Sequence, residues 1–119
     1  MTKEELENRL IDFSVLIIEI AESLPNTKVG NHIAGQIIRA GTSPAFNYGE
    51  AQDAESTNDF IHKVKIVLKE LRETFVAIKI IKRANLLNDI AKLQNAYQEN
   101  NELIAIFVST VKTSRGKQS

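Results

Sequence analysis

Apolar residues in the first part of the chain recur at the spacing of one helix face. One stripe contains residues separated by alternating steps of four and three: Leu6, Leu10, Phe13, Ile17, Ile20 and Leu24. This spacing predicts a helix over about residues 3–24. A second group, Ile11, Val15 and Ile18, falls on the other side of the same helix. A helix that is apolar on two sides needs two covers, and either the chain's own helices or another subunit can supply the second one.

Three further segments show helical periodicity. We expect helices over about residues 28–52, 57–84 and 89–113, followed by a frayed basic tail at 115–119. Pro44 lies inside the second segment and cannot donate a helical hydrogen bond. Ser56 is the expected N-cap of the third, with Asp59 three residues on. Asn100 lies on the apolar seam of the fourth, where a polar residue can fix the register between helices.

The connections between these segments are short, so successive helices should run antiparallel. The sequence therefore predicts an all-α protein, an antiparallel up-and-down four-helix bundle, with a single domain over residues 1–114. The chain has 119 residues, of which 43% are hydrophobic and 25% charged, which is an ordinary globular composition. It contains no cysteine, which excludes disulfides and thiol chemistry, and its longest apolar run is too short to span a membrane. Its first residues are acidic and unlike a signal peptide, so we expect a cytoplasmic location.

The formal net charge is zero, but the charges are unevenly distributed. Residues 1–27 contain two cations and six carboxylates, a net charge of −4. Residues 57–83 contain seven cations and three carboxylates, a net charge of +4. An acidic first helix and a basic third helix are typical of packing between elements or between subunits.

Polar residues also recur on one face of the second predicted helix. Together with three residues of the third helix, they form a candidate structural network or interface: Gln36, Arg39, Ser43, Asn47, Glu50, Lys63, Glu70 and Glu73. Arg39 paired with a carboxylate would make a charge-assisted hydrogen bond. Either this is a solvated face, or it is a partly buried network that fixes helix register or a subunit contact.

The same region resembles a family, the small bacterial four helix bundle proteins, which are related to proteins encoded in intervening sequences of 23S ribosomal RNA genes. The resemblance rests on Arg39, Gly41-Thr42-Ser43, Asn47-Tyr48, Glu50-Ala51, Ser56, Asp59-Phe60, Lys63, Lys69-Glu70 and Glu73. It covers residues 36–75 well and the flanking helices only in pattern. The chain departs from the family at Pro44-Ala45-Phe46 and at Phe75-Val76-Ala77, which lacks a common tryptophan, so we expect the packing to differ at these two places.

The resemblance implies a left-handed antiparallel bundle that assembles as a ring, typically a homopentamer, with no established catalytic activity. A similar bundle accompanies the reverse transcriptases of diversity-generating retroelements, where a basic ring contacts nucleic acid. These properties are expectations that the resemblance supplies. The residue pattern itself does not show them.

Basic residues of the third helix supply one independent argument for nucleic acid. A stripe about 30 Å long carries His62, Lys65, Lys69, Arg72, Lys79 and Arg83. Such a stripe could follow a phosphate backbone, and repetition around a ring would strengthen the contact. The alternative is a solvated face, or a contact with the acidic first helix of a neighbour in a protein scaffold that binds neither RNA nor DNA.

Catalysis has little support in the sequence. His32 and His62 are the only imidazoles, and neither belongs to the paired Glu-x-x-His pattern of a di-metal bundle. No phosphate-binding Gly loop and no Gly-x-Ser-x-Gly motif is present. We therefore expect no enzyme activity, no cofactor and no metal, and a homo-oligomer, expected to be a pentamer, as the main partner.

Overall fold

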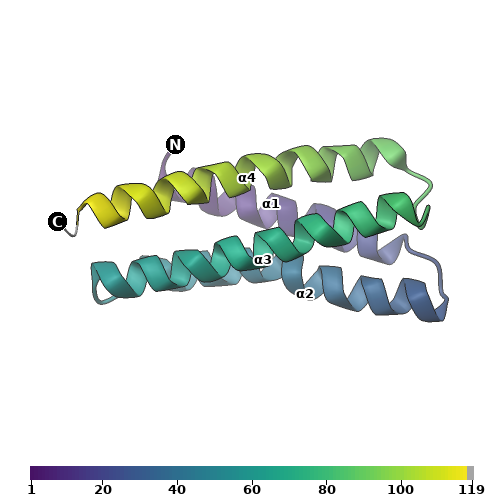
Figure 1. Ribbon diagram of the computed structural model, residues 1–119, viewed down its shortest axis with the longest axis horizontal. Helices are drawn as coiled ribbons and strands as arrows, with labels where there is room; N and C mark the ends of the chain where they lie inside the picture. Colours follow the sequence, from purple (N-terminus) through teal and green to yellow (C-terminus); the bar gives the residue numbers. More distant parts are fainter. Residues whose placement is uncertain (118–119) are drawn as a thin grey trace.

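Four long helices make up the described part of the chain. The computed structural model describes residues 1–117 and contains α1 (Lys3–Glu22), α2 (Lys28–Gln52), α3 (Thr57–Arg83) and α4 (Ile90–Gly116). Figure 1 shows the helices running alternately in opposite directions along the long axis of the molecule. The predicted antiparallel four-helix bundle is therefore confirmed.

Each helix begins at a side chain that satisfies one of the free backbone N–H groups of the first turn. The oxygen of each N-cap accepts a hydrogen bond of 3.0–3.1 Å from the N–H three residues on; these N-caps are Thr2, Thr27, Ser56 and Asp89. Pro44 does not interrupt α2, which is helical on both sides of it. The caps fix where the helices start, and the short loops then require each helix to reverse direction.

Two helix ends differ from the sequence prediction. α1 ends at Glu22 instead of 24, ahead of Pro25. α4 continues through Gly116, although we expected it to end near 113 and residues 115–119 to form a frayed tail. No proline or glycine interrupts the chain between Ile90 and Gly116, so nothing ends the helix earlier. Arg115 therefore projects from an ordered helix, while residues 118 and 119 of the expected tail lie outside the described residues.

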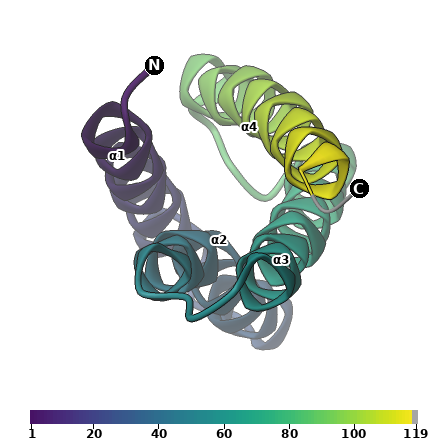
Figure 2. The same cartoon turned by 90° about the vertical axis from the view of Figure 1, so that its left-hand side faces the viewer.

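The helices follow one another around the bundle. α2 packs against both α1 and α3, α3 packs against α4, and α1 contacts α4 less extensively. α1 and α3 occupy diagonal corners, as the end view in Figure 2 shows, and their backbones do not approach each other closely. The acidic and basic helices of one chain therefore do not pair with each other.

The core lies between the inward faces of the four helices. It includes five residues of the first apolar face predicted for α1, all of them buried: Leu6, Leu10, Phe13, Ile17 and Ile20. The second apolar group of α1 remains in solvent, with exposed fractions of 44% for Ile11, 51% for Val15 and 41% for Ile18. A single chain thus covers one apolar side of α1 and leaves the other open. Within residues 1–117 no helix is both long enough and apolar enough to cross a membrane.

Candidate functional site: a basic groove across α3

A groove crosses the outer face of α3, with walls from α2 and α4. Its volume is about 910 Å³, and apolar side chains from three helices form its floor: Ile33, Leu68, Val76, Ala77, Ile80, Val108 and Val111. α2 contributes His32, Gln36 and Arg39 at one edge. The groove is possible because α3 presents the apolar residues Val76 and Ile80 to solvent beside the small, buried Ala77, while its neighbours rise on both sides.

Cations surround this apolar floor. Lys65, Lys69 and Arg72 come from α3, and Lys112 and Arg115 come from the last turns of α4. None of the five forms an ion pair with another described residue, although the charge of Lys69, after the hydrogen bond from Arg39, helps to lower the pKa of Glu73. A groove with an apolar floor and basic edges suits an amphipathic acidic partner.

Glu73 is the one carboxylate that lines the groove, and Arg39 neutralises it. The Arg39 guanidinium donates from Nη2 to Glu73 Oε2 at 2.6 Å and from Nη1 to Glu70 Oε2 at 3.0 Å. The hydrogen bond from Arg39 lowers the pKa of Glu73, and the bond to Glu73, followed by the charge of Glu70, raises the pKa of Arg39. The Glu70 side chain is 10% exposed and that of Arg39 54% exposed, so this pairing closes the α2–α3 seam at the edge of the groove.

The other members of the candidate polar network do not join this pairing. Asn47 Nδ2 donates to the Ser43 carbonyl at 3.0 Å and to Ser43 Oγ at 2.9 Å, entirely within α2. Lys63 Nζ lies 3.4 Å from Glu50 Oε2, an exposed link between α3 and α2. Gln36 lines the groove and forms no side-chain hydrogen bond within residues 1–117. The structure thus places seven of the eight residues in three separate groups along the α2–α3 seam and leaves Gln36 apart from them.

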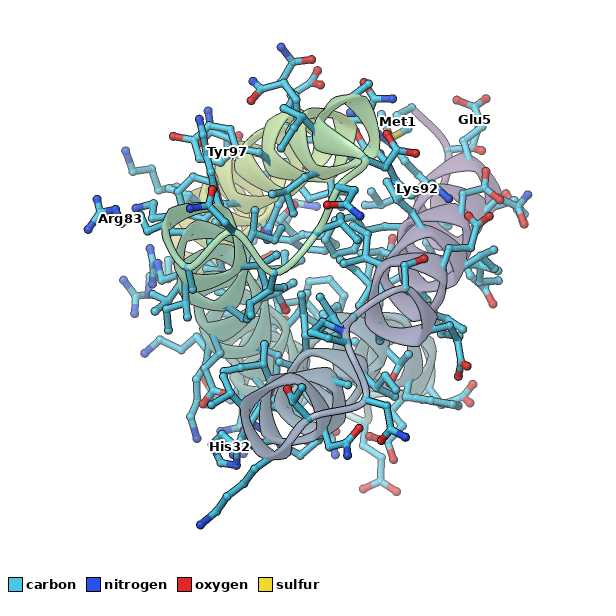
Figure 3. The ribbon with its side chains drawn as sticks, turned by 90° about the vertical axis from the view of Figure 1, so that its right-hand side faces the viewer. Met1, Glu5, His32, Arg83, Lys92 and Tyr97 are labelled. Carbon is cyan, nitrogen blue, oxygen red and sulfur yellow. The ribbon has the colours of Figure 1, made fainter. Side chains whose placement is uncertain are left out.

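The basic stripe predicted on α3 divides into two parts in the structure. Lys65, Lys69 and Arg72 line the groove, while His62 is exposed one turn before them. Lys79 and Arg83 lie outside the groove, with Lys82 and Tyr97, where α3 meets the start of α4. Lys79 Nζ sits 4.4 Å from the centre of the Phe75 ring, which itself stacks on Tyr97. Figure 3 shows Arg83 pointing away from the bundle at this end.

The opposite side of the molecule is acidic and apolar. At about 100° per residue, Val15 points almost directly away from the core face of α1, and Ile11 and Ile18 lie together on one side of it, about 40° and 60° away. Around these three lie the exposed carboxylates Glu4, Glu5, Glu7, Asp12 and Glu22, none of which forms an ion pair in the described chain. In Figure 3, Glu5 on α1 and Arg83 on α3 lie at opposite edges of the molecule. We call Ile11, Val15 and Ile18 with these carboxylates the α1 stripe.

Sequence reasoning missed the cations that α4 contributes to the groove. Lys112 and Arg115 carry no signal that joins them to α3, and Arg115 was assigned to a frayed tail. A bundle prediction that extended the last helix to Gly116 would have placed both beside the first turns of α3. The departure at Pro44-Ala45-Phe46 also has a consequence: the Phe46 side chain is 73% exposed on α2, outside both the groove and the α1 stripe.

Within residues 1–117 no three His, Asp or Glu side chains are close enough together to hold a metal ion. Tyr48 is buried against Phe107, with ring centroids 5.5 Å apart, and burial raises the pKa of its hydroxyl. Burial and the ring contact with Phe107 are typical of a tyrosine that packs in the core.

Comparison with known proteins identifies the family. The family model of the 23S rRNA-intervening sequence proteins matches residues 3–109. The chain belongs to this family. A solved structure from Bacteroides thetaiotaomicron, a protein with unknown function from the S23 ribosomal protein family, superposes with a TM-score of 0.82 at 28% sequence identity. The match covers 90% of this chain and 98% of that one. No curated protein matches the chain.

Proposed function

We propose that this protein is a non-catalytic, self-associating module of the cytoplasm, a ring of identical chains that serves as a binding scaffold. Five copies is the number we propose. The observation that carries the proposal is the α1 stripe, which leaves Ile11, Val15 and Ile18 in solvent on a helix whose other side is already buried. An exposed apolar face of this kind marks a site where another protein surface is expected to bind.

The energetics favour association. Covering three half-exposed aliphatic side chains contributes about 1 kcal/mol each, or about 3 kcal/mol per contact, before the groove residues are added. The complementary surfaces lie on different faces of the chain, so a contact between them is head-to-tail. Repeated head-to-tail contacts close into a ring when the rotation between copies permits it.

The mass of the purified chain in solution tests this proposal. Multi-angle light scattering after gel filtration should give a multiple of the chain mass of 13.3 kDa, and five copies would give five times that mass. A mass of 13.3 kDa at concentrations up to about 100 μM, where interfaces of micromolar affinity are populated, would contradict the proposal.

Nucleic-acid binding is the second candidate function, favoured by the uncompensated cations of α3. Lys79, Lys82 and Arg83 form no ion pair in the described chain and lie at one end of the bundle. In a ring they would be repeated around one rim, and such repetition strengthens weak phosphate contacts.

Titration of labelled RNA and DNA at about 50 and 200 mM salt tests this second function. A binder that contacts several phosphates loses affinity steeply over this range. Absence of binding at the lower salt concentration would leave the protein scaffold as the remaining function. Reversing the charge of Lys69 and Arg72 should abolish binding if the groove cations are used, and reversing Lys82 and Arg83 should abolish it if the rim is used.

A further inference from the structure

We propose that the α1 stripe of one copy lies in the basic groove of the next copy, with α1 parallel to the neighbour's α3. The proposal rests on the self-association proposed above and names the surfaces that carry it. It makes the groove a subunit interface, filled by an acidic amphipathic helix that is a second copy of this chain.

The two surfaces complement each other in chemistry. The groove has an apolar floor edged by Lys65, Lys69, Arg72, Lys112 and Arg115. The α1 stripe has an apolar centre edged by carboxylates. Neither set of charges is neutralised within residues 1–117, and α1 does not contact α3 in the same chain. Only a second copy can bring these charges together.

The two surfaces also agree in position along the bundle. Arg9 of α1 binds Glu99 of α4 at 2.7 Å, and the next residue, Asn100, reaches the α3 backbone at Leu71 and Phe75. Through α2, Ser14 Oγ lies 3.3 Å from the Gly41 carbonyl oxygen, and Arg39, two residues earlier, binds Glu70 and Glu73. The route through α4 places Arg9 level with residues 71–75 of α3, and the route through α2 places Ser14 level with about residue 70, so together they fix the height of α1 against α3 to within about two helical turns.

α1 and α3 run in the same direction, and a cyclic ring whose axis follows the long axis of the bundle preserves both direction and height. The neighbour's α1 therefore lies parallel to the groove, with Glu4 and Glu7 toward Lys65 and Lys69, to within about two helical turns. Val15 and Ile18 lie toward Val76 and Ile80 within the same margin.

The lengths of the two surfaces match as well. Glu4 to Glu22 spans about 27 Å of helix, and Lys65 to Ile80 spans about 22 Å. When the stripe fills the groove, Lys69 and Arg72 are covered, while Lys79, Lys82 and Arg83 stay outside it. Assembly and nucleic-acid binding would then use different parts of the α3 basic stripe.

Charge reversal on each surface, measured by light scattering, tests the proposal on the full chain. The groove variant is Lys69→Glu/Arg72→Glu, and the stripe variant is Glu7→Lys/Asp12→Lys. Each places like charges opposite each other, so each should weaken association by at least about a hundredfold and elute as single chains near 13.3 kDa. An equimolar mixture pairs opposite charges wherever the two variants alternate, so it should recover association as assemblies heavier than a single chain; a closed ring of five cannot alternate two variants, so the recovered species should be open or contain an even number of copies. The Lys82→Glu/Arg83→Glu variant is the matched control on the same helix and should keep the wild-type mass.

Each outcome separates this proposal from the broader one. A wild-type chain that stays at 13.3 kDa would overturn self-association itself. A wild-type oligomer that both variants leave intact would overturn only the docking mode, as would a mixture that remains dissociated. A groove variant that keeps its mass but loses RNA binding would assign the groove to nucleic acid instead. Far-ultraviolet circular dichroism of each variant confirms that the helices remain folded.

Discussion

Gly41 is the residue at which α1 and α2 approach each other closely. A Cβ atom built on Gly41 would lie 2.5 Å from Cγ2 of Ile17, a side chain with no exposed surface. The carbonyl of Gly41 also lies 3.3 Å from the Ser14 hydroxyl of α1. Among the small residues of this helix, Gly41 therefore sets the distance between two helices. Gly35 and Gly49 have no atom within 4 Å of the corresponding position.

We predict opposite effects for two alanine substitutions in α2. Gly41→Ala should lower the free energy of unfolding by about 1–2 kcal/mol, because overpacking against Ile17 exceeds the gain in helix propensity. Gly49→Ala gains the same propensity without a clash and should raise it by about 0.5–1 kcal/mol. Urea denaturation followed by circular dichroism measures both values. Equal shifts in the two variants would show that Gly41 does not limit the approach of α1.

Asn100 links α4 to the backbone of α3 from a fully buried position. In the amide orientation that satisfies its surroundings, Nδ2 donates to the Leu71 carbonyl at 3.1 Å and Oδ1 accepts from the Phe75 N–H at 3.0 Å. Its place on the apolar seam predicted a role in register. The partner could not be predicted from sequence, because main-chain groups of α3 carry no sequence signal.

Replacement of Asn100 by alanine should destabilise the bundle by about 2–3 kcal/mol. The variant loses two hydrogen bonds to buried groups and leaves a small cavity. Thermal and urea unfolding measure the change. The exposed neighbour Asn101 provides the control, since Asn101→Ala should change stability by less than about 0.5 kcal/mol. A loss at Asn100 no larger than that at Asn101 would contradict the register role.

At the scale of elements, each helix could be predicted from its own sequence, and the contacts between helices could not. Apolar periodicity and the expected cap Ser56 gave the first three helices nearly correct bounds. The last helix was predicted too short because Thr, Ser and Arg at its end are neutral signals, and only Gly116 stops it. Periodicity also marked α1 as apolar on two sides. It could not show that the second side would remain uncovered, because this depends on where α4 packs.

The α2–α3 seam should make stability depend on pH in the acidic range. Arg39 lowers the pKa of Glu73, so the pairing stabilises the fold above the ordinary pKa of a glutamate, and the stabilisation is lost as the pH falls through the lowered value. Glu73→Gln should therefore reduce the unfolding free energy near pH 7 by about 0.5 kcal/mol, since the pair is half exposed, and by less near pH 3. Urea titrations at several pH values between 3 and 7 measure this. A deficit that is constant with pH would contradict the assignment.

At the scale of the whole molecule, the uneven charge distribution acquires a geometrical meaning. The sequence placed a net charge of −4 in residues 1–27 and +4 in residues 57–83. The fold puts these segments at diagonal corners, so the charges face opposite directions (Figure 2). The groove itself could not be predicted from sequence, because its lining comes from three successive helices whose facing sides are set only by how they pack in the bundle.

The dependence of assembly on salt concentration should distinguish the ionic contribution to the free energy of association from the apolar one. Ionic edges are screened at high salt, whereas burial of Val15, Ile18, Val76 and Ile80 is not. We expect the oligomer to weaken by about tenfold between 50 and 500 mM NaCl and to persist at protein concentrations above its dissociation constant. Sedimentation velocity over a dilution series measures the constant at each salt concentration. An oligomer that strengthens steadily with salt would indicate an interface without the charge pairing described above.

Site-directed cross-linking tests the head-to-tail contact most directly, because the chain contains no cysteine of its own. Val15→Cys places a thiol at the centre of the α1 stripe, and Val76→Cys places one on the floor of the groove. The two variants are mixed, allowed to exchange subunits and treated with a short bismaleimide. The account predicts covalent dimers in the mixture and almost none with either variant alone. Efficient cross-linking of Val15→Cys to itself, or none in a mixture that light scattering shows to be oligomeric, would contradict it.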